Sequence, residues 1–529
     1  MSSPGDSVSG TSAIERQVVG ALGSIGAATL ASRVLGFVRD MVVALAFGAG
    51  PVTDAFFVAY RIPNMLRRLL AEGALSTAMV PVFTDYFVNR SRPECLRMIR
   101  AVLAATLLAL CTTVVVGMAL SPWIVSLFAP GFSAEPGQRT LAALLTRWLF
   151  PYLLFVGVAA FGMGLLNAQG RFFTAALGPA VFNVGMILGV LLLQHQLDPP
   201  ILSLVVGVLA GGLGQVLVQM PELHREGFLI APSRELSHPA LPRVARLLLP
   251  AVFGLAAVQV MVFVNTLLGS FLPAGSISFL YYADRVMEFP LGIFGVALAS
   301  ASLPAMSRQA AAGDHRGLAR TLNFTLGLGC FIAVPATVGL VMLRVPITRV
   351  LFERGQFGPA ETVATAQALL WYALGLAAFS AARITAQVFY AVGQPSLAVA
   401  SGLVSVAVNI VAALALMVPL GHGGLAAASS IGAVVNLLSL LWLARRRFGR
   451  LGGRALVVSA ARTLLACVPL AGVCALALSA WPRGARQSVE AVWLGGTIAV
   501  GATAFWVAAV LLRAPERSAL TRLLPGHRG

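Results

Sequence analysis

The chain has 529 residues, of which 58% are hydrophobic and only 11% are charged, a composition that excludes an ordinary soluble globular protein. Its formal charge of +18 comes from 37 basic residues, all of them Arg. A charge of this sign can indicate nucleic-acid binding, but the Arg residues concentrate in alternate loops between apolar runs. We therefore assign the basic loops mainly to membrane topology and expect no nucleic-acid partner.

Apolar runs of about 20 residues, the length that crosses the hydrocarbon core of a bilayer, recur along the chain and predict about fourteen transmembrane helices. Arg is dense in the loops around Arg90, Arg225, Arg308 and Arg447, and sparser in the loops between them. By the positive-inside rule, both termini are cytoplasmic. The fold class that we predict is an all-α polytopic membrane protein.

The first predicted span carries Arg33, Arg39 and Asp40 inside apolar sequence. Helical geometry places Arg33 and Asp40 on one face, with Arg39 about a third of a turn away. An Arg at the centre of a membrane helix costs about 2.5–3.5 kcal/mol to insert, so it normally faces a wet cavity or a partner. The alternative is that each Arg reaches the membrane interface or closes a structural ion pair.

The second predicted span contains Asp54, Arg67, Arg68 and Glu72. Glu72 lies four residues after Arg68 and can pair with it, whereas it lies five residues after Arg67. Arg67 is therefore the better candidate for a free, ligand-facing cation. Asp54 and Arg68 share a face of a regular helix, unless Pro63 kinks that helix and rotates the register. The Arg residues of both spans together indicate a cavity for an anion.

The two halves of the chain repeat each other at a fixed offset. ALSTAMVP at Ala74 to Pro81 matches ALASASLP at Ala297 to Pro304, an offset of 223 residues. The same offset pairs Trp148 with Trp371, Ala168 with Ala391, and Gly170 with Gly393. Two parallel six-helix bundles of this kind are typical of transporters that work by alternating access. We predict a polar cytoplasmic tail (1–17), an N-terminal six-helix bundle (18–235), a C-terminal six-helix bundle (236–448), an extra helix pair (449–512) and a basic cytoplasmic tail (513–529).

The second half again places charge in apolar sequence, at Asp284, Arg285 and Glu288. Arg285 and Glu288 are three residues apart and can pair along a helix, which is the alternative to ligand contact by Arg285. Arg383, four residues before Gln387, is a weaker candidate for a cavity-lining cation.

Four segments resemble the lipid II flippase family, also called the MurJ or MviN family, of the multidrug/oligosaccharidyl-lipid/polysaccharide exporter superfamily. They are SRVLGFVRD, TDAFF, PNMLRRLLAEGALSTAMVPVF and YYADRVMEFPLGIFGVALASASLP. The resemblance covers nearly the whole chain. It implies a multi-pass protein of the bacterial inner membrane that moves lipid II, a precursor of peptidoglycan, from the cytoplasmic to the outer leaflet.

Position by position, the resemblance implies that Arg33, Arg39, Arg67 and Arg285 bind the substrate, with Asp54 and Glu72 supporting or gating them. We place Asp40, Arg68, Asp284, Glu288 and Arg383 in the same supporting or gating group. The resemblance also implies that the extra helix pair helps to form a lateral groove for a long lipid tail. The partners that we expect are lipid II, membrane lipids and cell-wall synthesis proteins.

Two alternatives remain open, and two are disfavoured by the residues present. A flippase for another polyprenyl-linked oligosaccharide, or a non-transporting scaffold for cell-wall assembly, remains open. A cationic-drug exporter is disfavoured because its cavity should be acidic. An enzyme is less favoured, because we find no paired catalytic carboxylates or nucleophile motif. The five Cys and six His show no metal-ligand spacing, and no Lys is present to complete a Walker A motif, so we expect no metal, no cofactor and no direct use of ATP.

Overall fold

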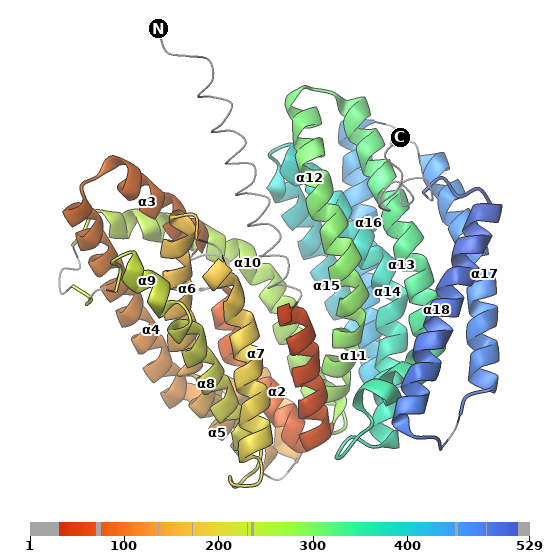
Figure 1. Ribbon diagram of the computed structural model, residues 1–529, viewed down its shortest axis with the longest axis horizontal. Helices are drawn as coiled ribbons and strands as arrows, with labels where there is room; N and C mark the ends of the chain where they lie inside the picture. Colours follow the sequence, from red (N-terminus) through yellow and green to blue (C-terminus); the bar gives the residue numbers. More distant parts are fainter. Residues whose placement is uncertain are drawn as a thin grey trace. The chain divides into compact units, whose positions relative to one another are not determined.

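The computed structural model describes residues 31–69, 76–135, 137–171, 173–229, 231–233, 237–449, 453–482 and 484–516. All regular secondary structure in these ranges is helical, which confirms the predicted all-α class. The chain forms two compact units, Met1–Val260 and Met261–Gly529 (Figure 1). The polar tail predicted at 1–17 lies outside the described residues.

The first unit starts with a helix that is described over residues 31–47. It continues with α2 (Pro51–Arg67), α3 (Ser76–Asn89), α4 (Arg92–Phe128), the 3-10 turn η2 (Pro130–Ala134), α5 (Gln138–Leu149), α6 (Tyr152–Ala168), α7 (Phe173–Leu193), α8 (Leu202–Leu217) and α9 (Met220–Arg225). Helix α10 (Ala240–Ser270) begins in this unit and ends in the second.

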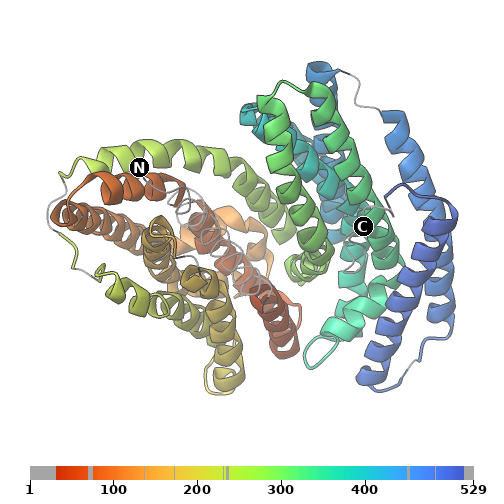
Figure 2. The ribbon, with the colours of Figure 1, turned by 45° about the horizontal axis from the view of Figure 1, so that its top comes forward.

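The second unit contains α11 (Ser276–Pro290), the π-helical turn η3 (Leu291–Gly295), α12 (Val296–Ala311), α13 (His315–Phe352), α14 (Pro359–Ala391), α15 (Pro395–Leu420), α16 (His422–Phe448), α17 (Gly453–Ser479) and α18 (Gln487–Leu511). In the described part of the chain, ten segments are long and apolar enough to cross a membrane. Helices α17 and α18, drawn in blue in Figure 2, run alongside each other and pack on α13.

Helix boundaries repeat at the offset found in the sequence. The first helix ends at residue 47 and α10 at Ser270, and α6 ends at Ala168 where α14 ends at Ala391. Each of α6 and α14 is followed by a glycine with positive φ, 75° at Gly170 and 70° at Gly393. These matches confirm two homologous bundles with an additional helix pair.

The same two boundary residues show why the helices stop where they do. The amide of Arg171 donates to the carbonyl of Leu166 at 2.8 Å, and the amide of Gln394 donates to that of Phe389 at 2.8 Å. Such a bond closes the last helical turn only if the residue before it adopts the left-handed conformation, which glycine does without steric cost. Gly170 and Gly393 therefore fix equivalent turns in the two bundles.

In each unit, a π-helical turn follows the helix that carries the predicted charged residues, α2 in the first unit and α11 in the second. A π-helical turn follows α2 at residues 68–69, and another, η3, follows α11 at Leu291–Gly295. Helix α2 itself continues through Pro63 without a break. The expected change of register thus comes at the π-helical turn and not at the proline, which places Arg68 outside the regular helix that holds Asp54.

Candidate functional site

Arg39 is held in a buried cluster between the first helix and α7. Its Nε and Nη2 donate to Oδ1 of Asp40 at 3.0 and 2.7 Å, and its Nη1 donates to Oδ1 of Asn183 at 3.0 Å. Asn183 in turn donates from Nδ2 to the carbonyl of Ser32 at 3.1 Å. The side chains of Arg39 and Asp40 are 10% and 4% exposed. This pair is therefore buried and linked through Asn183 to α7 and to the backbone of Ser32.

Arg67 lies at the end of α2 and is half-buried. Its Nε donates to Oδ1 of Asn64 at 2.8 Å, so the expectation of a cation without a protein partner is wrong. The bond links residues three apart on one helix and orients the guanidinium. Arg67 and Arg39 both lie within electrostatic range of the Tyr152 side chain, so the structure places these two predicted cations in one neighbourhood.

The wall of this neighbourhood is aromatic. The rings of Tyr60 and Tyr152 have centroids 6.4 Å apart, and Tyr60 stacks on Phe56 at 5.9 Å with an interplanar angle of 9°. Tyrosines supply an apolar face and a polar tip, which suits the border between a charged group and apolar surroundings. The sequence reasoning missed Tyr60 and Tyr152, although both interrupt apolar runs.

The remaining predicted residues of the first unit differ in exposure. Asp54 is 2% exposed in the first turn of α2. Arg33 and Arg68 are exposed. Glu72, and with it the predicted Arg68–Glu72 pair, lies outside the described residues.

In the second unit, Arg285 and Glu288 form the ion pair that their spacing allows. Nη1 of Arg285 lies 2.7 Å from Oε2 of Glu288, and the two side chains are 31% and 50% exposed. The guanidinium carbon lies 5.0 Å from the ring centroid of Tyr281, and Nη2 donates to its hydroxyl at 3.4 Å. Asp284 is half-buried next to them, and Arg383 is exposed on α14.

The two ion pairs are therefore chemically different. Arg39–Asp40 is dry and tied to a second helix, so removing either partner would strand a buried charge. Arg285–Glu288 is partly exposed, and an exposed pair of this kind contributes only about 0–1 kcal/mol, so an incoming anion can replace the carboxylate at lower cost than in the buried pair. Arg67 and Arg285 are thus the better placed to bind a ligand, and Arg39 is better placed to hold the first helix against α7.

Sequence reasoning also missed the amides Asn64 and Asn183. An isolated Asn within an apolar span is a signal of polar contacts between or along membrane helices. That signal was available at Asn183, but its partner Arg39 is 144 residues away and no local spacing rule connects them. In the described part of the chain, no group of three or more His, Cys, Asp or Glu residues is arranged to hold a metal ion.

Comparisons with known proteins agree over most of the chain. The sequence profile of the family described as Lipid II flippase MurJ matches residues 43–490. A Vibrio cholerae protein described as a probable lipid II flippase MurJ is 38% identical over 429 residues, 79% of this chain and 81% of that protein. A Burkholderia cenocepacia protein described as a lipid II flippase MurJ is 35% identical over 436 residues, 81% of this chain and 84% of that protein.

Solved structures show the same fold. The structure described as lipid II flippase MurJ in an inward closed conformation superposes with a TM-score of 0.77 at 24% identity, and the match covers 92% of this chain and 98% of that chain. An inward-facing multidrug resistance MATE family transporter of the MOP superfamily superposes with a TM-score of 0.66 at 17% identity, covering 80% and 96% of the two chains.

Proposed function

Because the chain belongs to the lipid II flippase MurJ family, we propose that it moves lipid II from the cytoplasmic to the outer leaflet of the bacterial inner membrane by alternating access. The observation that carries the proposal is the family match over residues 43–490. The two homologous bundles support it, since two such bundles that rock around a shared site are the usual architecture of alternating access. In this reading the chain is a transporter and not an enzyme.

The substrate combines a pyrophosphate, a large polar head and a polyprenyl chain. The head needs hydrated, cationic contacts, while the chain stays in lipid. Arg suits the pyrophosphate because its guanidinium stays protonated and forms paired, charge-assisted hydrogen bonds with phosphate oxygens. We assign this contact to Arg67 and Arg285, with Arg33 and Arg39 as further cations of the site.

The partners of these cations then act as gates or supports. Glu288 accepts from Nη1 of Arg285 and is exposed enough to be displaced by phosphate. Asp40 neutralises Arg39 and holds it in place. Asp54, Arg68, Glu72, Asp284 and Arg383 remain assigned to supporting or gating roles.

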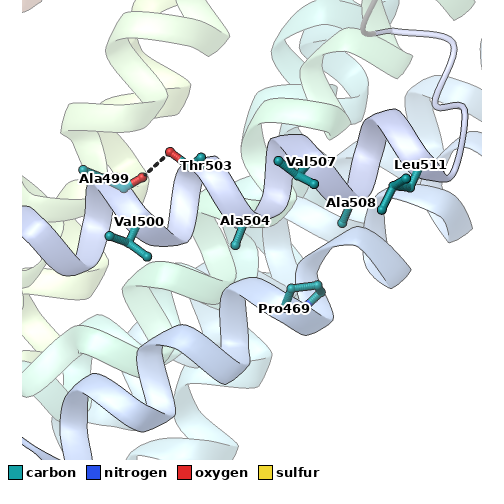
Figure 3. Close-up of a pocket in the computed structure, with 8 residues that line it drawn as sticks. All are labelled: Pro469, Ala499, Val500, Thr503, Ala504, Val507, Ala508 and Leu511. Atoms are coloured by element: carbon teal, nitrogen blue, oxygen red, sulfur yellow. Dashed lines mark hydrogen bonds between the residues drawn. The ribbon is translucent and has the colours of Figure 1, made fainter.

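The polyprenyl chain has a matching surface on the extra helix pair. A cavity of about 560 Å³ lies between α17 and α18. Figure 3 shows Pro469 on α17 and the other lining residues along α18: Ala499, Val500, Thr503, Ala504, Val507, Ala508 and Leu511. The one hydroxyl among them, that of Thr503, donates to the carbonyl of Ala499 at 2.9 Å. An apolar groove with its polar group internally satisfied suits an isoprenoid chain.

The decisive experiment is complementation of a cell depleted of its own lipid II flippase, with the leaflet accessibility of lipid II as the readout. We expect the wild type to restore growth and outward lipid II. We expect Arg67→Ala and Arg285→Ala, at matched membrane expression, to lose both. Arg139→Ala is the control, since Arg139 is an exposed cation outside the proposed site.

The outcomes separate the alternatives. If the wild type is stably inserted but lipid II stays in the inner leaflet, the substrate assignment fails in favour of another polyprenyl-linked oligosaccharide. If Arg67→Ala and Arg285→Ala rescue growth as well as the wild type does, these arginines are not the substrate site. If growth returns without any movement of lipid II, the chain acts as a scaffold that recruits cell-wall synthesis proteins.

A further inference from the structure

A second cavity, this one polar, lies in the second unit and is lined by none of the charged residues of α11. It measures about 620 Å³ and is formed where α12 ends, α13 begins and α14 and α16 end. The distribution of Arg in the sequence assigns this side of the protein to the cytoplasm. Its polar lining consists of Ser307, His315, Gln394, Arg446 and Arg447.

The lining has the composition of an anion site. Two guanidinium groups, an imidazole, an amide and a hydroxyl face one space, and no carboxylate lines the cavity in the part of the chain that the structure describes. The nearest acid along the chain, Asp314, is engaged elsewhere, because its Oδ1 accepts the amide of Gly317 at 2.8 Å as the N-cap of α13. The ring of His315 is set by Phe448, with centroids 5.7 Å apart.

The first unit provides an internal comparison at the same offset of 223 residues. Arg92 and Arg171 stand there in the places of His315 and Gln394. Arg171 pairs with Glu222 at 3.7 Å and Glu226 at 3.4 Å, and Arg92 donates to the carbonyl of Glu226. Glu222 of α9 and Glu226, the residue that follows α9, thus supply the first copy with carboxylates that pair with Arg171. In the second copy the cations are instead Arg446 and Arg447, at the positions of Leu223 and His224, and no carboxylate of the described residues lines the cavity.

An exposed apolar stripe leads along α16 to the second cavity. Ile431, Val434, Leu438 and Trp442 are all exposed and recur at three- or four-residue spacing, so they share one face of the helix. The guanidinium carbon of Arg446 lies 3.8 Å from the ring centroid of Trp442, which joins the stripe to the cavity. Trp and Arg in this order mark the membrane interface, with apolar surface on one side and headgroups on the other.

We propose that this cavity binds the phosphate headgroup of an anionic phospholipid of the cytoplasmic leaflet, with an acyl chain along the stripe from Ile431 to Trp442. Arg446 and Arg447 contact the phosphate oxygens as charge-assisted donors, and Gln394 and Ser307 contact the headgroup hydroxyls. The site is separate from the residues assigned to lipid II and does not depend on that assignment. The apolar stripe favours a lipid over a free phosphate, because a soluble anion has no acyl chain to pack against it.

The test is native mass spectrometry of the full-length chain in detergent, titrated with dioleoyl phosphatidylglycerol. Dioleoyl phosphatidylcholine and glycerol 3-phosphate serve as comparison ligands. We expect phosphatidylglycerol to bind more tightly than phosphatidylcholine, and glycerol 3-phosphate not to displace it. In Arg446→Gln/Arg447→Gln, the affinity for phosphatidylglycerol should fall by about tenfold or more.

The matched control is Arg316→Gln/Arg320→Gln, which removes the same charge from exposed positions of α13 that do not line the cavity. It should bind like the wild type. Equal losses in both double variants, equal binding of the two phospholipids, or displacement by glycerol 3-phosphate would each overturn the proposal. Gln394→Leu keeps every charge and leaves α16 intact, so it tests the site if the Arg variants fold poorly. An unchanged affinity for phosphatidylglycerol would count against the site. A several-fold loss of that affinity would support it.

Discussion

Burial decides what each arginine in this protein can do. Arg39 and Arg285 are both Arg in apolar helices, and both contact a carboxylate at 2.7 Å. The first pair is buried and the second is partly exposed, so exchanging the carboxylate for a ligand costs less at Arg285 than at Arg39. The sequence identified both arginines but assigned them one role, because exposure depends on helices that are distant in the chain.

At this scale we predict that Arg39→Ala destabilises the protein by about 3–5 kcal/mol, because it removes the ion pair that Arg39 forms with the buried carboxylate of Asp40. Thermal unfolding of the purified protein in detergent measures this. The double variant Arg39→Ala/Asp40→Ala removes both charges and should recover a large part of the loss. If the double variant is as unstable as the single variant, the stranded charge is not the cause.

Small residues control how the helices pack. A Cβ at Gly189 of α7 would lie 2.5 Å from the Cα of Gly207 of α8, and one at Gly185 would lie 2.5 Å from the Cα of Gly211. Backbones approach this closely in membranes when small residues recur four positions apart on both helices. In Figure 1 the two helices accordingly lie side by side in the first unit.

We expect Gly189→Ala to cost about 1–3 kcal/mol, since the added methyl meets backbone that cannot move away alone. Gly178→Ala on the same helix is the matched control. Its Cβ would meet only the side chain of Gln215, at 3.8 Å. The control should be neutral or slightly stabilising, because Ala favours the helix over Gly. The measurement is the melting temperature of Gly189→Ala and of Gly178→Ala in the same detergent. Equal melting temperatures would show that close packing of α7 on α8 does not require glycine at position 189.

The extra helix pair allows a further prediction. Ala504→Trp fills the cavity between α17 and α18, so it should reduce flipping of long-chain lipid II several-fold and leave a short-chain analogue unaffected. Val492→Trp adds the same ring at an exposed position of α18 outside that cavity and should behave like the wild type. Leaflet accessibility of both substrates in reconstituted vesicles is the measurement. An equal loss for both chain lengths would show that the cavity does not hold the tail.

For the molecule as a whole, we predict the orientation in the membrane. In a variant whose five Cys are replaced, Ser133→Cys after α4 should react with a membrane-impermeant maleimide in intact spheroplasts. Ala312→Cys at the end of α12 should react only after lysis. Both positions are exposed, so access to the reagent and not burial decides the labelling. The reverse pattern would invert the orientation that the Arg-rich loops predict.

Much of the architecture was predictable because its causes are local or periodic. Apolar runs predict helices, the density of Arg predicts the sidedness, and one offset predicts two bundles. The π-helical turns after Arg67 and Pro290 were not predictable, since no composition rule distinguishes them from the proline kink that Pro63 suggested. The contacts of Arg39 with Asn183 and of Arg171 with α9 depend on which helices become neighbours, which spacing along the chain does not determine.

The constant offset also records the history of the two halves. The pairs of boundaries at residues 47 and 270, 92 and 315, and 168 and 391 differ by 223 in every case. Between the first and last of these points, each copy has therefore kept the same net number of residues since the duplication. Substitutions have meanwhile changed the chemistry at matched positions, with Arg67 opposite Pro290 and Arg61 opposite Asp284. In this stretch the two halves diverged by exchanging side chains and without any net insertion or deletion.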